Sequence, residues 1–301
     1  MKSTLVFALR LLLLIVIYFV LFSIVSAILL PPPTTAPAPD EAAAIFVALL
    51  AMSILNSSVV AYVLIRSRWT GFKLIITLAW VLFGVTTLMS QIETFVFIRT
   101  LPPGFLTRLV LTGAVFSAIF SALAVIVFGK LRSKDTAIKS HWWTELSGRE
   151  WIVRLAIIAV AYLILYFTFG YYIAWRNPAL VAYYGGTNSG GFLDQLLQVV
   201  RDTPWLPLLQ VGRALLWTAL AIPVIRLMKG RWWEAGLAVA LLFSVVMNTQ
   251  LLLPNPFMPT TVRMSHMLET ATSNFLFGWI VVWLLRKLAP YSPIASQEGG
   301  R

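Results

Sequence analysis

Long apolar runs separated by short polar segments dominate the chain from end to end. Eight of these runs approach or exceed the ~20 residues that an α-helix needs to cross the hydrocarbon core of a bilayer. We therefore predict an all-α, polytopic transmembrane bundle of about eight helices. The seventh run is the shortest and ends at Pro254, so we expect it to stop early or to lie partly re-entrant. The predicted spans cover residues 4–30, 43–65, 74–98, 105–129, 152–175, 204–228, 235–253 and 262–286.

The first apolar run resembles a signal peptide in two respects. Lys2 precedes it, and Val25-Ser26-Ala27 has the small residues of a cleavage site. Its apolar stretch over residues 11–30 is longer than the ~7–15 residues of a signal-peptide core. It also matches the fifth run, as described below, and we expect it to remain as a membrane helix.

Composition agrees with lipid as the solvent for this chain. Apolar residues make up 59% of the 301 residues and charged residues 11%, whereas a soluble domain carries about 25% charged residues. In a soluble protein the net charge of +12 would indicate a nucleic-acid partner. Here the basic residues lie in short loops between apolar runs, so we predict the lipid bilayer as the partner and no nucleic acid.

Two residue types limit the chemistry that the chain can hold. It has no cysteine, which excludes disulfides, thiolate nucleophiles and cysteine-ligated metals. Its two histidines, His141 and His266, are too few for a histidine-rich metal site. We therefore predict no metal and no cofactor.

Lysine and arginine concentrate in alternate loops, which predicts the orientation of the chain. They are frequent after the second, fourth, sixth and eighth spans, as in the turns 66–73 and 226–231. The loop 31–42 has none, and the loop 175–203 has only Arg176 and Arg201. The positive-inside rule then places both termini in the cytoplasm, with the protein in the plasma (inner) membrane.

The two halves of the chain share an ordered set of matches at constant offsets, which predicts a tandem repeat of four plus four helices. An even number of helices per repeat gives parallel topology, with an axis along the membrane normal. The matching pairs are Arg10 with Arg154, Tyr18 with Tyr162, Phe120 with Phe277, and Lys130 with Lys287. The predicted units are a first repeat over 1–131, a cytoplasmic linker over 132–150, a second repeat over 151–288 with an outer loop at 175–203, and a cytoplasmic tail over 289–301. Within the outer loop, apolar spacing from Phe192 to Val200 predicts an amphipathic helix on the outer leaflet.

A polar stripe runs along the eighth span. Its members recur at spacings of three and four, which places them on one helical face. A charged group at the bilayer centre costs about 2.5–3.5 kcal/mol on insertion scales, so this face must meet other helices or water. The stripe consists of Arg263, His266, Glu269, Thr270 and Ser273, bordered by Thr272 and Asn274.

Other spans carry polar residues at a similar predicted depth. Gln210 and Arg213 lie on one face of the sixth span, and Asn248 lies near the outer end of the seventh. The third span adds a stripe with Glu93 beside it. We predict a polar pocket open to the outside, lined mainly by the third, sixth, seventh and eighth spans. The residues predicted to bind a ligand or relay protons are Arg213, His266, Glu269, Gln210, Glu93, Gln91, Asn248 and Ser273.

Each element of this cluster also has a structural interpretation. Arg213 with Glu269 or Glu93 can form an ion pair that locks helices together. His266 and Glu269 supply only half of a metal site, and a Ser–His pair on one helix rarely reaches the geometry of a nucleophile and its base. The motifs HExxH, GxSxG, GxGxxG and Walker A do not occur. A proton relay through His266 fits better, because histidine titrates near neutral pH.

Three functions follow from this pattern. The preferred hypothesis is a protein that binds or transports a small polar, anionic or amphiphilic molecule, with Arg213 and Arg263 holding the anion and Glu269 and His266 carrying protons. Against it, the cytoplasmic half of the spans is almost purely apolar and offers no inward path. The second is an intramembrane enzyme acting on a lipid-linked substrate at the outer leaflet, with Glu269 or His266 as general base. The third is a non-catalytic subunit or assembly factor, with a membrane-protein partner or a second copy of the chain.

Overall fold

The computed structural model confirms the all-helical, membrane-spanning architecture. It describes residues 2–32, 37–98, 101–132, 146–186, 190–255 and 257–286, and these residues contain no strand. Eight of their helices are long and apolar enough to cross a membrane, so the chain is a multi-pass membrane protein. Every predicted span is found, with ends that differ by at most four residues, as at Pro39 where residue 43 was predicted.

The first four spans comprise α1 to α5, the last four comprise α6, α9, α10 and α11, and the short helices α7 and α8 lie in the loop between α6 and α9. The helices are α1 (Lys2–Leu29), α2 (Pro39–Arg66), α3 (Gly71–Phe83), α4 (Met89–Phe97), α5 (Phe105–Val127), α6 (Gly148–Tyr172), α7 (Pro178–Tyr183), α8 (Phe192–Asp202), α9 (Trp205–Leu227), α10 (Trp232–Leu241) and α11 (Thr260–Leu285). A π-helical turn at Gly84–Leu88 joins α3 to α4 in one span. A second π turn at Leu242–Val246 and a 3-10 turn at Thr249–Leu252 extend α10, so the seventh span reaches Leu252 without turning back.

The second and fifth spans begin four residues earlier than predicted because their first turns are polar. Pro39 is at the start of α2, and Asp40 and Glu41 follow it in the first turn, where acidic groups stabilise the positive end of the helix dipole. Before α6, Ser147 accepts from the Glu150 amide and Glu150 accepts from the Ser147 amide, which forms a capping box. Hydropathy does not register such turns, although the helix needs them to satisfy its free N–H groups.

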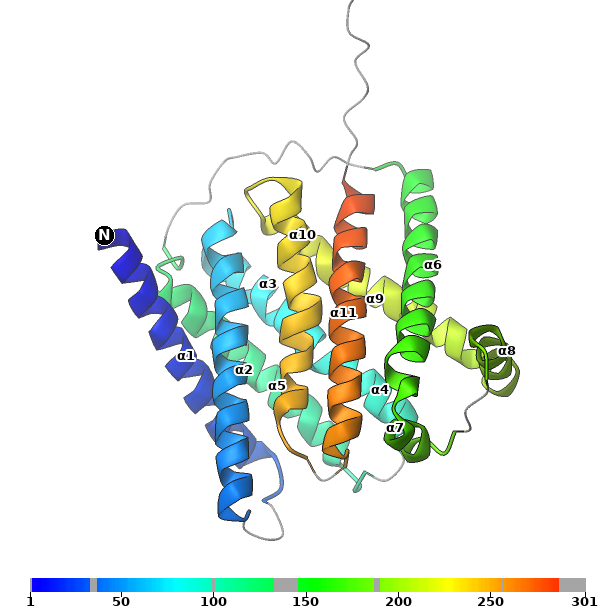
Figure 1. Ribbon diagram of the computed structural model, residues 1–301. Helices are drawn as coiled ribbons and strands as arrows, with labels where there is room; N and C mark the ends of the chain where they lie inside the picture. The colour runs from blue at the N-terminus through cyan, green and yellow to red at the C-terminus, as the bar shows by residue number, and fades with distance from the viewer. Residues whose placement is uncertain are drawn as a thin grey trace, which may run out of the picture.

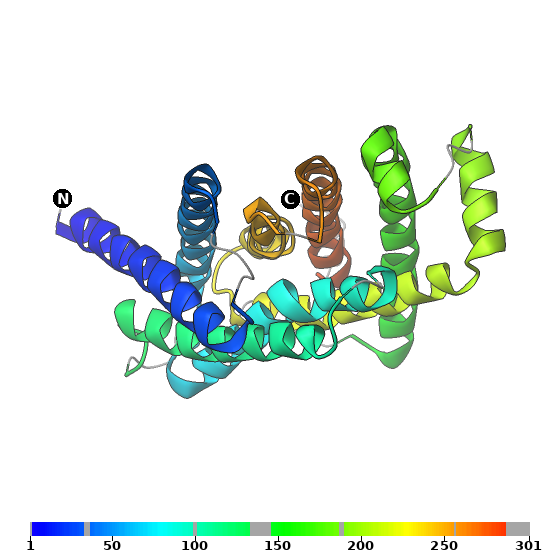
Figure 2. The same ribbon diagram turned by 90° about the horizontal axis from the view of Figure 1, so that it is seen from below.

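The spans form two layers (Figures 1 and 2). In Figure 2, α2, α10, α11 and α6 stand side by side in one row, and α1, α5, α3 and α9 cross below them at an incline. Each layer therefore contains three spans of one half of the chain and one span of the other. The second span of each half, α2 or α9, packs in the layer that the other half supplies, so the two halves interlock.

Two aromatic pairs that are matched by sequence offset make similar contacts. The rings of Tyr18 on α1 and Phe120 on α5 lie 5.0 Å apart between centroids. Tyr162 on α6 and Phe277 on α11, the residues matched to them by sequence offset, lie 4.7 Å apart. The first and fourth spans of each half are thus joined by the same aromatic pair.

The halves also meet directly at the turns after α2 and α9. The Arg68 amide donates to the Leu227 carbonyl at 2.8 Å, and the Lys229 amide donates to the Arg66 carbonyl at 3.0 Å. These two hydrogen bonds form a short antiparallel bridge. Most of the predicted linker (133–145) and all of the predicted tail lie outside the described residues.

Close packing of α10 against α11 depends on Gly278. A Cβ atom at this position would lie 2.6 Å from the Ala240 Cα and 2.7 Å from the Ala240 nitrogen. Backbone atoms cannot rotate away as a side chain can, so the two helices would have to separate.

We expect Gly278→Ala to destabilise the protein by about 1–3 kcal/mol, the cost of overpacking a filled core. Gly212→Ala in α9 is the matched control, because a Cβ there meets nothing within 4 Å. The control should be neutral or stabilising by up to about 1 kcal/mol, since alanine favours helix over glycine. Thermal unfolding in detergent measures both, and equal midpoints for the two variants would contradict the close approach.

Candidate functional site

A cavity of about 660 Å³ occupies the end of the bundle away from the N-terminus. It lies among the ends of α4 and α6, the starts of α9 and α11, and the segment that follows the second π turn. These are the four predicted spans together with two walls that were not predicted, the fifth span (α6) and the loop helix α8. The α6 wall is aromatic, with Tyr162, Tyr166, Phe167 and Tyr171. It was not predicted because the prediction relied on stripes of polar residues.

Arg213 is the centre of the first polar group in the cavity. Its guanidinium forms an ion pair with Glu93 of α4 and donates to Gln210 Oε1 at 2.9 Å. It also lies 5.9 Å from the ring centre of Tyr162. Arg213 is only 2% exposed, and Glu93 is its carboxylate partner, as one of the two predicted pairings had it. This group ties α9 to the third span across the cavity floor.

Two donors of this group have no hydrogen-bond partner among the described residues. They are the Nε of Arg213 and the Nε2 of Gln210, and both atoms are buried. A buried donor without a partner costs about 1–3 kcal/mol, so two unsatisfied donors lie beside the ion pair, one of them on Gln210 outside the cavity lining.

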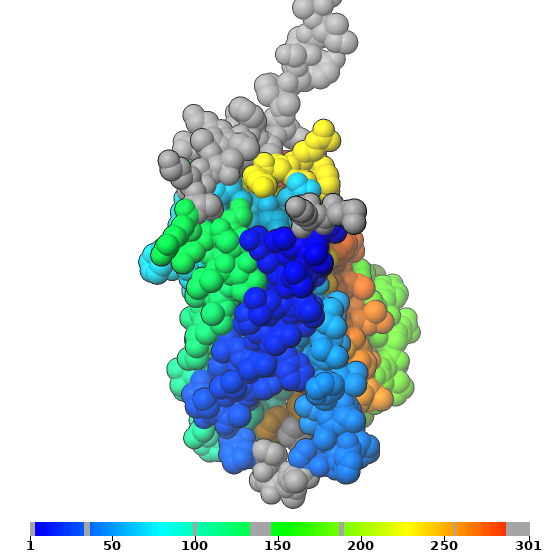
Figure 3. Space-filling view, turned by 90° about the vertical axis from the view of Figure 1, so that its left-hand side faces the viewer, coloured from blue at the N-terminus to red at the C-terminus, as the bar shows by residue number. Residues whose placement is uncertain are grey.

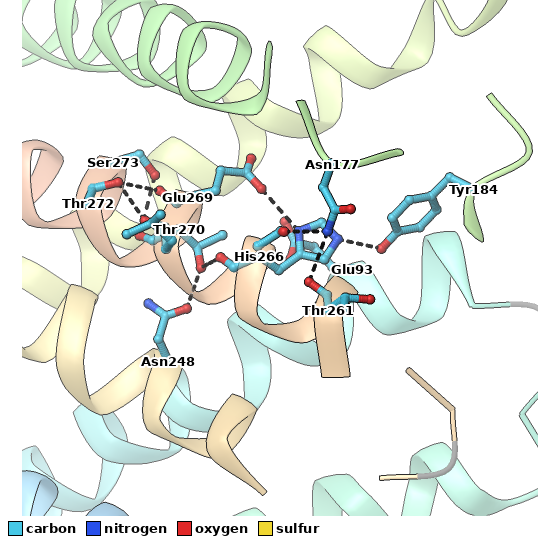
Figure 4. A network of polar contacts seen from close by, with 12 residues as sticks. Glu93, Asn177, Tyr184, Asn248, Thr261, His266, Glu269, Thr270, Thr272 and Ser273 are labelled. Carbon is cyan, nitrogen blue, oxygen red and sulfur yellow. Dashed lines mark hydrogen bonds and ion pairs between the residues drawn. The ribbon is translucent and has the colours of Figure 1, made fainter. Parts of the chain in front are cut away.

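His266 is the centre of the second polar group. Its Nδ1 lies 3.1 Å from Glu269 Oε2, and its Nε2 lies 2.9 Å from the Tyr184 hydroxyl (Figure 4). Burial raises the pKa of Tyr184 well above that of a free phenol, and the carboxylate of Glu93 raises it further. Tyr184 therefore keeps its proton at neutral pH. A carboxylate, an imidazole and a phenol are thus aligned in one row.

The loop after α6 positions Tyr184. Asn177 caps α7 by accepting from the Ala179 amide at 3.0 Å, and its Nδ2 donates to Ser265 Oγ of α11 at 2.8 Å. Figure 4 shows Asn177 above His266 and Tyr184 to its right. Sequence reasoning missed both residues, because they lie outside the apolar runs. The one sequence feature that could have indicated Tyr184 is the pair Tyr183-Tyr184 before two glycines.

A row of hydroxyl and amide groups continues from His266 along α11. Thr270 donates from its hydroxyl to Asn248 Oδ1 beyond the second π turn, and it is also 2.5 Å from the His266 carbonyl. Ser273 follows at the cavity wall. The row joins α11 to the seventh span and places Asn248, as predicted, at the site.

The structure brings together six of the eight residues predicted to bind a ligand or relay protons. Gln210 lies beside Arg213 and is fully buried, and Gln91 donates from its Nε2 to Ser90 Oγ at 3.4 Å. Neither lines the cavity. Arg263 also lies outside it, because its guanidinium is bound to the Leu251 carbonyl at 3.0 Å and to the Leu253 carbonyl. The six that line it are Glu93, Arg213, Asn248, His266, Glu269 and Ser273.

The cavity lining carries more acidic than basic groups. Glu93, Glu269 and Asp202 contribute carboxylates, while Arg213 contributes one guanidinium and His266 an imidazole. The Arg213 charge is neutralised by Glu93, so while His266 is neutral the unbalanced charge in the cavity is negative. No three His, Cys, Asp or Glu side chains gather at metal-binding distance in the described part of the chain.

Comparisons of the chain with protein-family models, with curated proteins and with solved structures found no match.

We expect Arg213→Gln to destabilise the protein by about 3–5 kcal/mol, because it leaves the Glu93 carboxylate buried without its partner. The double variant Glu93→Gln/Arg213→Gln should recover much of this loss, since neither charge remains. Arg201→Gln, at an exposed position of α8, removes the same charge and should leave the unfolding midpoint unchanged. If the double variant loses as much free energy of unfolding as the two single variants together, the two charges act independently. The stabilising ion pair between Arg213 and Glu93 would then be disproved.

Proposed function

We propose that the protein binds and transports a small amphiphilic molecule in the cavity among α4, α6, α8, α9 and α11. The observation that carries the proposal is the division of one enclosed space into two kinds of wall. Aromatic rings of α6 form one wall, and the carboxylate, imidazole and hydroxyl groups of α11 form another. The volume of about 660 Å³ lies within the 300–1,000 Å³ of pockets that hold drug-sized ligands.

The amphipathic helix α8 supports a ligand that comes from the bilayer. Gln195, Gln198 and Asp202 line the cavity, while Leu193 and Leu197 on the opposite face are 67% and 65% exposed. A helix with this division lies at the membrane interface with its apolar face in lipid. In this position α8 is a thin wall between the cavity and the acyl chains.

The charge balance favours a cationic or neutral head group over an anionic one. Arg213, which the sequence pattern predicted to hold an anion, already has Glu93 and Gln210 as partners. Arg263 is bound to backbone carbonyls outside the cavity. An anion would meet the Glu269 carboxylate without a free cation to offset it, whereas an ammonium or hydroxyl group would find acceptors.

Proton exchange at His266 would couple to ligand binding. When His266 is neutral, Tyr184 donates to Nε2 and Nδ1–H donates to Glu269. When it is protonated, both ring nitrogens donate and the Tyr184 oxygen accepts. The same two contacts serve both states, so a proton can arrive or leave without rearrangement of the site.

We further propose that the protein lies in the plasma membrane with both termini in the cytoplasm and the cavity on the outer side. The distribution of lysine and arginine over the loops supports this orientation. The recurring Tyr18–Phe120 and Tyr162–Phe277 contacts and the interlocked layers support a four-plus-four duplication. In the first half, Tyr18 stacks on Phe22 and meets Phe116, so aromatic rings pack around the tyrosine there. The ligand site would belong to the second half alone.

A second candidate is acid–base catalysis on a lipid-linked substrate. The row Glu269–His266–Tyr184 favours it, because a carboxylate that orients an imidazole against a hydroxyl is a common arrangement for proton transfer. Turnover of a bound amphiphile would distinguish this candidate, since a carrier releases its ligand unchanged.

Ligand binding can be tested with amphiphiles that share one alkyl tail and differ in the head group. A quaternary ammonium head should raise the thermal unfolding midpoint of the wild type most, a sugar head less, and a sulfate head least. Glu269→Gln should abolish the preference for the cation. Glu41→Gln, which removes an exposed carboxylate in the first turn of α2, is the matched control and should behave as wild type. A larger shift with sulfate than with ammonium would overturn the head-group assignment.

The pH dependence provides a second test. Lowering the pH from 8 to 5 should weaken binding of the cationic amphiphile, because protonation at His266 adds a positive charge beside the head group. The charged and titratable groups around His266 are Glu269, Glu93, Arg213 and Tyr184. His266→Gln should remove most of the pH dependence, whereas His141→Gln, at the other histidine, should leave it intact. Equal pH dependence in both variants would rule out His266 as the coupling group.

A further inference from the structure

A second concave site lies at the opposite end of the bundle, near the start of α1. It encloses about 550 Å³. Figure 3 shows this face, with α1 in dark blue between α5 in green and α2 in lighter blue, and the yellow turn before α10 above the start of α1. We call this site the basic notch, and its lining residues are Val6, Phe7, Arg10, Ile65, Phe128, Lys130 and Lys229. Three are cations, four are apolar, and none of these described residues is acidic.

Helix ends bring the three cations together. Arg10 of α1 donates from its guanidinium to the Phe128 carbonyl at the end of α5, at 3.3 Å. Lys130 donates to the Ser67 carbonyl just after α2, at 2.8 Å. Lys229 follows α9, and its amide is bound to the Arg66 carbonyl. Carbonyls at helix ends carry only partial charges, so the Phe128 carbonyl does not offset the full positive charge of Arg10.

Two other cations at the same end of the bundle have carboxylate partners. Arg66 pairs with Glu234 at 3.0 Å. Arg154, the residue matched to Arg10 in the second half, lies 3.7 Å from Glu150, four positions before it. Four positions before Arg10 is Val6. The apolar residue in this place leaves the charge of Arg10 without the carboxylate that its counterpart has.

We propose that the basic notch binds the phosphate head group of an anionic phospholipid. Its rim is apolar and partly exposed, with Val6 at 46% and Phe7 at 38%, and it adjoins the lipid-facing side of α1, where leucines such as Leu9 and Leu12 are exposed. Acyl chains can thus lie along α1 while the phosphate meets the cations. Basic pockets between membrane helices are known to hold anionic head groups in this way.

The position of the notch indicates what a bound lipid would do. Arg10 and Lys130 belong to the first half of the chain and Lys229 to the second. A phosphate shared by them would link the two halves at the end where the turns after α2 and α9 already meet. The notch shares no lining residue with the cavity, so its ligand is independent of the proposed transport.

The test uses the full chain, stripped of lipid in a neutral detergent. Dioleoylphosphatidylglycerol, dioleoylphosphatidylcholine and inorganic phosphate are added separately, and lipid retention by native mass spectrometry and the unfolding midpoint are recorded. The variant is Lys229→Gln, because the backbone bond of Lys229 survives the substitution and the fold is kept. The matched control is Lys73→Gln, which removes a cation that stacks on Trp69 at 4.0 Å outside the notch.

We expect the wild type to retain phosphatidylglycerol and to be stabilised by it, with no shift from phosphatidylcholine. Lys229→Gln should bind phosphatidylglycerol about fivefold more weakly, the contribution of one cation near an anionic lipid surface, and Lys73→Gln should match the wild type. An equal loss in both variants would show general charge attraction and overturn the site. An equal shift with inorganic phosphate would overturn the lipid as the ligand.

Discussion

The ion pair between Arg213 and Glu93 sets the arrangement of the polar end of the bundle. Two charges at membrane depth are tolerated only when each satisfies the other, and this pair joins α9 of one layer to the π-interrupted third span. Because α9 comes from the second half and α4 from the first, the pair also fixes the halves relative to each other. His266, Glu269 and Asn248 then lie on the remaining walls of the space that the pair defines.

Hydropathy and polar spacing predicted the eight spans and most of the cavity, because both reflect one constraint. In lipid, backbone groups must be satisfied within helices and charges must face inward. The stripe on α11 obeys this constraint, and so Glu269 and His266 could be identified. Arg263 also faces inward, but its guanidinium donates to backbone carbonyls of the preceding turn. Residue spacing cannot distinguish this local role from ligand binding. Tyr184 and Asn177 lie in a loop whose path depends on tertiary contacts, and no periodicity points to them.

Tyr18 and Tyr162, which are matched by sequence offset, have different surroundings. Around Tyr18, the stacked ring of Phe22 and the edge-on ring of Phe116 complete the packing. Around Tyr162, the guanidinium of Arg213 and open space take their place. Aromatic rings supply more buried area than almost any other side chain, so the first half supplies dispersion and rigidity. In the second half, polar groups replace part of this aromatic packing. The first half keeps its aromatic packing and so stabilises the bundle.

The π turns of the third and seventh spans have a consequence for the geometry of both. A π turn adds one residue to a helix without adding a turn, and each residue rotates the helical face by about 100°. Glu93 follows the turn at Gly84–Leu88, and Asn248 follows the turn at Leu242–Val246. Without the extra residue, each side chain would project from a different side of its helix, with Glu93 turned from Arg213 and Asn248 from Thr270. One inserted residue in each span thus sets the direction in which the following side chains point. With it, Glu93 and Asn248 face the cavity instead of lipid or neighbouring apolar groups.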